Sequence, residues 1–256
     1  YTLCGKDRIH PSTDGHLVMA YLFLKAQGLA GKPVADIRID GAGKKVTRSD
    51  NCRVSDLSVS SDNLTFTYEA KSLPYPIDTS YYDNEKHTQA DALSVISFMD
   101  EMNYEGLSVS GLSDGYYGLT IGGEFIGRFT ARELERGINM ALLQNTPQYK
   151  QAMKIRQMNE ERWLKERKMR EFYWVEYNLM RKTGMLWACD EAAVDTLRKY
   201  RPHDIFLQWN GDLWLQYMHK GIREDCVNEQ QNLVDRIYEQ NKPIPLRIEI
   251  KKFTDL

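Results

Sequence analysis

Asp7 and His10, an aspartate and a histidine three residues apart, are the side chains of this 256-residue chain whose types and spacing best suit catalysis. A carboxylate at the Nδ1 atom of a histidine holds the imidazole in one tautomer and leaves Nε2 free to take a proton from a nucleophile. One short turn can supply both groups, and Pro11 restricts His10 to extended backbone. The pattern predicts the acid–base half of a hydrolase triad. The alternative is a capped loop that makes only local hydrogen bonds.

A helix directly after this pair is expected to hold the loop in place. Ser12, Thr13 or Asp14 can cap the first N–H groups of that helix. Apolar residues then recur at helical spacing, and they are Leu17, Val18, Tyr21, Leu22 and Leu24. Gly28 suits the left-handed position that ends a helix.

The longer string around the pair is more specific than the pair itself. It reads Asp-x-x-His-Pro-x-x-x-Gly-His-x-x-Met-Ala over residues 7–20, and it resembles the last conserved block of the SGNH (GDSL-type) hydrolases. The resemblance implies that His10 is the catalytic base, that Asp7 is its orienting acid and that His16 is structural. Residues 107–147 look like the C-terminal extension of some bacterial GDSL-type esterases.

The nucleophile of that family is absent from this sequence. The family carries its serine in a Gly-Asp-Ser motif near the start of its domain, whereas here Ser113-Asp114-Gly115 has the reverse order. We therefore expect the serine in an upstream SGNH segment or on another polypeptide, and no esterase activity from this chain alone. The resemblance further implies a small-molecule or polysaccharide ester as substrate, favours a carbohydrate (acetyl) esterase, and places the protein in the periplasm or outside the cell.

The expected fold class is α+β, in three parts. Residues 1–30 form the terminal loop and helix of an SGNH α/β/α domain, residues 31–130 a small antiparallel β region, and residues 131–256 a mainly helical extension with a terminal strand. Strands at 107–112, 116–121 and 124–129 are predicted to form hairpins. Thr130 and Glu133 are spaced as a capping box. The strand at 244–250 is predicted at a sheet edge, because Pro245 cannot donate to a ladder.

Composition excludes several other classes of protein. The formal net charge of −2 argues against a nucleic-acid partner, which would select a basic surface. No apolar run is long enough to span a membrane. The four cysteines contain no C-x-x-C pair, so no metal site is expected, and either disulfides or reduced buried thiols fit them. No cofactor is implied.

The main alternative is a non-catalytic module in which residues 31–256 bind glycan or pack against the hydrolase. Aromatic and amide side chains gather at 209–214, on an expected loop between Trp209 and Trp214, and that loop either binds sugar or plugs a core. Tyr81-Tyr82-Asp83-Asn84 offers the same two interpretations. A third hypothesis is self-association through the long charged helices.

Overall fold

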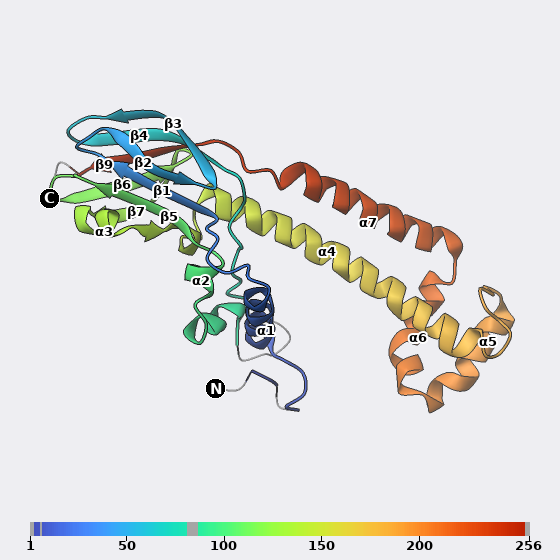
Figure 1. Ribbon diagram of the computed structural model, residues 1–256. Coiled ribbons are helices and arrows are strands. Elements are labelled where there is room, and N and C mark those ends of the chain that lie inside the picture. Colours follow the sequence, from blue (N-terminus) through green and yellow to red (C-terminus); the bar gives the residue numbers. More distant parts are fainter. Residues whose placement is uncertain (1–2, 6, 81–86, 254–256) are drawn as a thin grey trace. The chain divides into compact units, whose positions relative to one another are not determined.

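The computed structural model describes residues 3–5, 7–80 and 87–253, and Figure 1 shows their arrangement in helices and strands. Contacts divide the chain into two compact units, Tyr1–Lys154 with Asn241–Leu256, and Ile155–Gln240. The expected α+β class is confirmed. The predicted borders at residues 30 and 130 both fall inside the first unit.

Two sheets form the β part of the first unit. The sheet of order β2-β1-β5-β8 consists of Lys45–Asp50, Ala35–Asp40, Glu105–Ser110 and Ile138–Asn139. The sheet of order β3-β4-β9-β6-β7 consists of Cys52–Val59, Asn63–Ala70, Leu246–Lys252, Tyr116–Ile121 and Glu124–Thr130.

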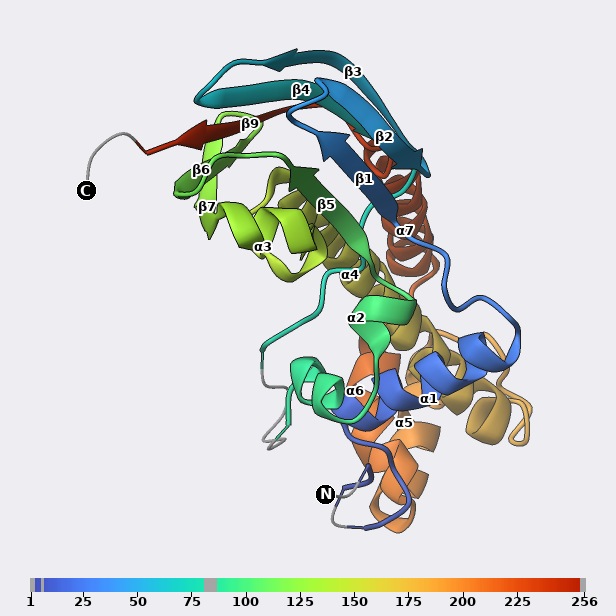
Figure 2. The same cartoon turned by 60° about the vertical axis from the view of Figure 1, so that its left-hand side comes forward.

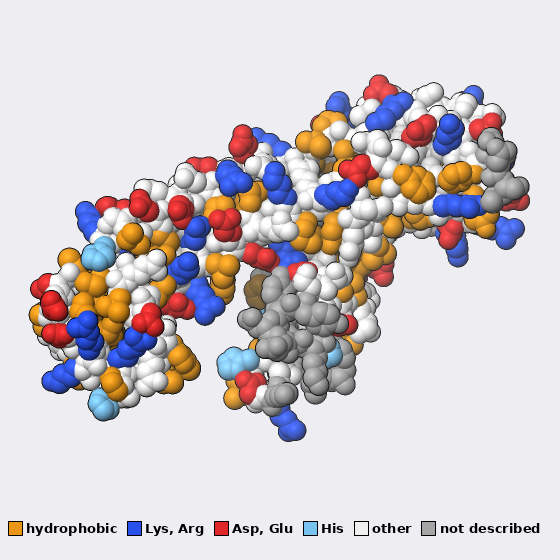
Figure 3. All heavy atoms as spheres, turned by 180° about the vertical axis from the view of Figure 1, so that it is seen from behind, with side chains coloured by type: hydrophobic (Ala, Val, Ile, Leu, Met, Phe, Trp, Pro, Cys, Tyr) orange, Lys and Arg blue, Asp and Glu red, His pale blue; other side chains and the backbone are white. Residues whose placement is uncertain are grey.

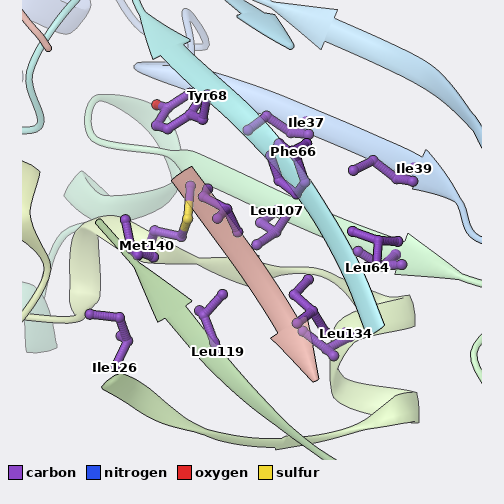
Figure 4. Packing of buried hydrophobic residues seen from close by; sticks show 14 of the residues in the cluster. Ile37, Ile39, Leu64, Phe66, Tyr68, Leu107, Leu119, Ile126, Leu134 and Met140 are labelled. Carbon is purple, nitrogen blue, oxygen red and sulfur yellow. The ribbon is translucent and has the colours of Figure 1, made fainter. Parts of the chain in front are cut away.

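One hydrophobic core lies between these sheets. Alternate residues are buried along β4, where Leu64, Phe66 and Tyr68 face the core, because successive side chains of a strand point to opposite faces. Figure 4 shows Ile37, Phe66 and Leu107 directed into the same interior. Helix α3 (Ala131–Arg136) packs beside β5 (Figure 2), and the predicted capping box of Thr130 and Glu133 begins it.

Two expectations about strand pairing were wrong. The β region is not wholly antiparallel, because β1 and β5 pair in parallel with Ala35 opposite Glu105. The predicted hairpin between the strands at 107–112 and 116–121 does not form, since β5 and β6 belong to different sheets, whereas the β6–β7 hairpin is present. Local turn signals cannot show that a chain crosses from one sheet to another.

The predicted C-terminal strand exists as β9, but its predicted place was wrong. It lies between β4 and β6 and pairs antiparallel with both, so it is a central strand. Pro245 stands just before its first residue, Leu246, where a missing N–H costs no ladder hydrogen bond. The β-sandwich is therefore completed by residues that follow the helical unit in sequence.

The first unit also contains a small helical cluster. Helix α1 (Thr13–Ala26) packs against the 3-10 helix η1 (Gln89–Ser94) and helix α2 (Phe98–Glu101), with Leu17, Val18 and Tyr21 in their shared core. The phenol of Tyr21 donates to the Glu101 carboxylate at 2.9 Å. The predicted end of α1 is confirmed by Gly28, whose φ is 73°.

The second unit is helical. Helix α4 (Pro147–Val175) leads into it from the first unit, and a π-helical turn (Glu176–Met180) follows. Helices α5 (Glu191–Tyr200), α6 (Ile205–Tyr217) and α7 (Lys220–Gln240) complete it. Acidic and basic side chains are interspersed along its surface (Figure 3), with i,i+4 pairs such as Arg167–Glu171. Among the residues that the structure describes, no helix is both long and apolar enough to cross a membrane.

Candidate active site

Asp7 and His10 are in direct contact. The His10 Nδ1 atom lies 2.5 Å from Asp7 Oδ2, and Asp7 Oδ1 accepts the backbone N–H groups of Ile9 at 3.0 Å and His10 at 3.1 Å. The hydrogen bond from His10, followed by those from the two N–H groups, lowers the pKa of Asp7 to about 2. The carboxylate is therefore charged at neutral pH and fixes the Nδ1 proton of the imidazole.

The other side of the imidazole is open to solvent. The His10 side chain is 83% exposed, and its Nε2 atom has no hydrogen-bond partner in the part of the chain that the structure describes. A neutral imidazole with its proton on Nδ1 carries a lone pair on Nε2. This arrangement presents a base whose orientation is set by Asp7 and whose reactive atom faces outward.

Backbone pairing gives the loop its shape. Cys4 and Pro11 form an isolated antiparallel bridge, in which the N–H of Gly5 donates to the carbonyl of His10 at 2.8 Å. The N–H of Ser12 donates to the carbonyl of Leu3 at 3.1 Å. Gly15 allows this close approach, because a Cβ at that position would overlap the same carbonyl.

A second carboxylate beside a histidine was missed by sequence reasoning. Asp14 is fully buried at the start of α1, where it accepts the hydroxyl of Ser12 and the N–H of Gly15. The His87 Nδ1 atom lies 4.0 Å from Asp14 Oδ2. No signal in the sequence could join two residues so far apart along the chain.

Helix α1 has two apolar faces, and only one of them is covered. Leu17, Val18 and Tyr21 are buried, as the predicted helix requires. The residues Met19, Leu22 and Phe23 form a second stripe at helical spacing and are 55%, 56% and 64% exposed. We call this stripe the outer face of α1. The helix belongs to the same segment as the Asp7–His10 loop and begins three residues after His10.

The aromatic residues at 209–214 do not lie on a loop, so that prediction was wrong. They belong to α6, and Trp214 is fully buried with its indole N–H donating to Glu176 Oε1 at 2.7 Å. Trp214 thus fits the core interpretation, whereas Trp209 is 67% exposed. Tyr81-Tyr82-Asp83-Asn84 lies outside the described residues.

Other groups that bear on chemistry are few. Within residues 3–5, 7–80 and 87–253, no group of three or more His, Cys, Asp or Glu side chains is arranged to hold a metal ion. Cys52 and Cys226 are buried free thiols, which agrees with the alternative of reduced buried thiols for these two, whereas Cys189 is an exposed free thiol. Ser113, in the reversed motif, forms hydrogen bonds with Tyr117 and Lys252, and its hydrogen-bond partners among the described residues include no histidine.

The helical unit coincides closely with a known domain. Residues 153–242 match the family model described as the diltiazem deacetylase C-terminal helical domain. No curated protein matches the chain. The structure is similar to that of BT4096, a gut microbial diltiazem-metabolizing enzyme, with a TM-score of 0.92 and 41% sequence identity. That match covers 99% of this chain and 57% of the other, so the chain spans little more than half the length of this relative.

Proposed function

We propose that this chain supplies the catalytic base and the orienting acid of a serine ester hydrolase of the SGNH (GDSL) type. The observation that carries the proposal is the 2.5 Å contact between Asp7 and His10, with His10 Nε2 open to solvent. The similarity to a diltiazem deacetylase domain supports a hydrolytic role, because a deacetylase releases an acetyl group by hydrolysis.

In the proposed reaction, His10 Nε2 takes the proton of the serine hydroxyl as the oxygen attacks the ester carbonyl. Asp7 stabilises the imidazolium that forms, and His10 then gives its proton to the leaving alcohol. Water, deprotonated by the same imidazole, attacks the acyl-serine. The bond between the acyl carbon and the serine oxygen then breaks, the imidazolium returns its proton to that oxygen, and the acid is released. Because the pKa of Asp7 is about 2, its carboxylate remains charged throughout this cycle.

The serine is proposed to reside on a segment that covers the outer face of α1. That face is apolar and exposed, and it belongs to the helix that directly follows the His10 loop. The relative of known structure extends well beyond the matched region, since only 57% of it is covered. A hydrolase domain packed on Met19, Leu22 and Phe23 would bring its serine to the same end of the molecule as His10.

The substrate we propose is an acetyl ester of a carbohydrate. The resemblance of the 7–20 string to the SGNH block supports a serine esterase, and the deacetylase domain supports an acetyl group as the acyl part.

The direct test is hydrolysis of p-nitrophenyl acetate by this chain alone and by the same chain joined to a Gly-Asp-Ser-bearing SGNH segment. We expect turnover only in the second case, and its loss when the serine of that segment is replaced by alanine. Equal turnover by the chain alone would refute the assignment of the nucleophile to another segment.

A matched pair of variants tests the outer face of α1. Phe23→Ser is expected to weaken association with the serine-bearing segment by at least tenfold, while Gln27→Ser, an exposed polar position at the end of the same helix, leaves it unchanged. Both variants should retain the stability of the isolated chain within about 0.5 kcal/mol, because neither side chain is buried there. Unchanged association of Phe23→Ser would remove this face from the proposal.

A further inference from the structure

The helical unit contains a cavity of about 630 Å³ that the proposed hydrolase chemistry does not use. Its walls come from α4, from the segment between the π-helical turn and α5, and from the first turns of α7. The volume lies within the range of about 300–1,000 Å³ that is usual for small-molecule sites. Every lining residue belongs to the second unit.

Trp187 forms one wall, and its backbone is held in an unfavourable conformation. Its φ is 65°, a left-handed value that costs a bulky L-residue about 1–2 kcal/mol. The Trp187 N–H donates to Glu176 Oε2 at 2.9 Å, while Glu176 Oε1 accepts the indole N–H of Trp214. A buried carboxylate thus fixes the backbone of a tryptophan that is still 45% exposed.

The element that supplies Glu176 is itself irregular. Glu176 begins the π-helical turn at the end of α4, and such turns occur often at functional sites. Strained residues also concentrate at binding and catalytic sites, where the surrounding structure holds them in place. The π-helical turn places Glu176, and Glu176 holds the strained backbone of Trp187. Together they fix the position of the Trp187 ring.

A second aromatic ring stands at a right angle to the first. The rings of Tyr173 and Trp187 have centroids 6.0 Å apart and an interplanar angle of 87°. The two residues therefore form an aromatic corner in the wall of the cavity. The C–H face of a pyranose ring can pack against such a surface while its hydroxyl groups point away from it.

Polar side chains with opposite charges complete the cavity. Lys220 and Arg223 are donors, Glu224 and Asp225 are acceptors, and Asn228 is both. The Lys220 Nζ atom lies 3.4 Å from Glu224 Oε1. The Arg223 guanidinium donates to the backbone carbonyls of Tyr217 and Met218 at 2.7 Å each. The two positive charges balance the two negative ones, so the lining favours neither an anion nor a cation. Hydroxyl groups, which both donate and accept, match this set of partners.

We propose that this cavity, formed by Trp187, Tyr173 and the first turns of α7, binds a neutral sugar residue. The inference deepens the proposed function and rests on it for the idea that the sugar belongs to the ester substrate. The cavity itself contains neither Asp7 nor His10. A site of this kind would select the alcohol part of the ester, which the acid–base pair does not recognise.

The test is calorimetric titration of the 256-residue chain with neutral β-1,4-linked tetrasaccharides of glucose, xylose and mannose. Choline and inorganic phosphate serve as charged probes. We expect at least one tetrasaccharide to bind and both charged probes to fail. Absence of binding by all three tetrasaccharides, or tighter binding of choline or phosphate, would overturn the proposal.

Variants then locate the site. Trp187→Gly removes the ring, keeps the N–H that Glu176 accepts and tolerates the positive φ, so the fold is preserved. We expect it to weaken sugar binding at least tenfold, and Asp225→Asn to weaken it by a smaller factor. Trp209→Ala removes an exposed tryptophan elsewhere in the same unit and should leave binding unchanged. Equal effects of Trp187→Gly and Trp209→Ala would contradict the location.

The outcome does not depend on catalysis, because the titration involves no serine. If no sugar binds but the chain joined to a serine-bearing segment hydrolyses p-nitrophenyl acetate, the sugar site is refuted and the proposed hydrolase function is not. Sugar binding without any hydrolysis in the joined protein would refute the assignment of Asp7 and His10 alone.

Discussion

Two hydrogen-bonded carboxylates of the first unit, Asp7 and Glu105, have pKa values shifted in opposite directions. Asp7 lies in an exposed loop, where bonds from His10 and from two backbone N–H groups lower its pKa to about 2. Glu105 lies on β5 and is fully buried, and this burial raises its pKa to about 7. Tyr68 donates to Glu105 Oε1 at 2.8 Å and Gln148 at 3.2 Å.

The difference lies in how the two charges are compensated. Every lone pair that Asp7 uses is directed at a donor, and water reaches the rest of the group. Glu105 Oε2, in contrast, is buried with no hydrogen-bond partner among the described residues, so its charged form is poorly stabilised. A shifted pKa therefore reports the surroundings of a carboxyl group and does not by itself identify a catalytic one. Of these two groups, only Asp7 is accessible to solvent. Glu105 is part of the interior, whereas Asp7 can act through His10.

The largest effect that would sharpen this comparison is expected at His10. In the chain joined to a Gly-Asp-Ser-bearing SGNH segment, His10→Ala should lower kcat for an acetyl ester by about 10⁶-fold, because loss of the proposed base disables the nucleophile. His16→Ala, an exposed histidine on α1, is the matched control and should leave kcat unchanged. A kcat of the His10→Ala variant within tenfold of that of the unaltered protein would show that His10 is not the catalytic base.

Asp7→Asn should follow with a smaller loss of about 10⁴-fold in kcat. The amide keeps the shape of the carboxylate but removes its charge, so the His10 tautomer and the imidazolium lose their support. KM should change little, since the proposed role of Asp7 is to act through His10. A change confined to KM would instead indicate that Asp7 shapes the binding surface.

Glu105→Gln should alter stability and leave catalysis intact. The pKa of Glu105 is about 7 in the folded chain, against an ordinary value of 4.5. At low pH the carboxyl is therefore neutral, and its contribution to the free energy of unfolding is fully present. This contribution is lost as the pH rises from about 4.5 to about 7, and it amounts to about 3 kcal/mol. Urea unfolding at about pH 4 and about pH 8 should show this loss in the unaltered chain and a flatter response in the variant. The same response in both would show that Glu105 does not titrate in this range.

The smallest expected effect is that of Tyr68→Phe. It removes one of the two donors to Glu105 and leaves the carboxylate less satisfied, at a cost of about 1–2 kcal/mol in the free energy of unfolding near pH 8. Near pH 4, where the carboxyl is neutral, the cost should be smaller. Urea unfolding at both pH values measures it, and an equal cost at both would separate Tyr68 from the ionisation of Glu105.

The Asp7–His10 contact could be predicted from the sequence because it is closed within one turn. The same holds for the start and end of α1 and for the Thr130–Glu133 capping box, which depend on neighbours along the chain. The pairing of Asp14 with His87 and the insertion of β9 between β4 and β6 depend on the folded arrangement. No local pattern carries that information.

The segment at 209–214 shows how a local signal can mislead. Asn210-Gly211 is typical of a turn, yet both residues lie inside α6. Gly211 leaves room for the side chain of Arg201, whose Nε atom lies 3.1 Å from where a Cβ at this position would stand, and the Arg201 guanidinium pairs with the Asp212 carboxylate at 2.6 Å. The aromatic wall that we assign to sugar binding instead depends on Trp187, whose position is set by the buried Glu176.

The central claim is that Asp7 and His10 activate a serine that another segment carries. It is tested most directly by the rate at which a fluorophosphonate labels that serine in the joined protein, compared between the unaltered form and His10→Ala. We predict rapid labelling of the unaltered form and labelling at least a hundredfold slower in the variant. Equal labelling rates would contradict the account, because the serine would then be activated without His10.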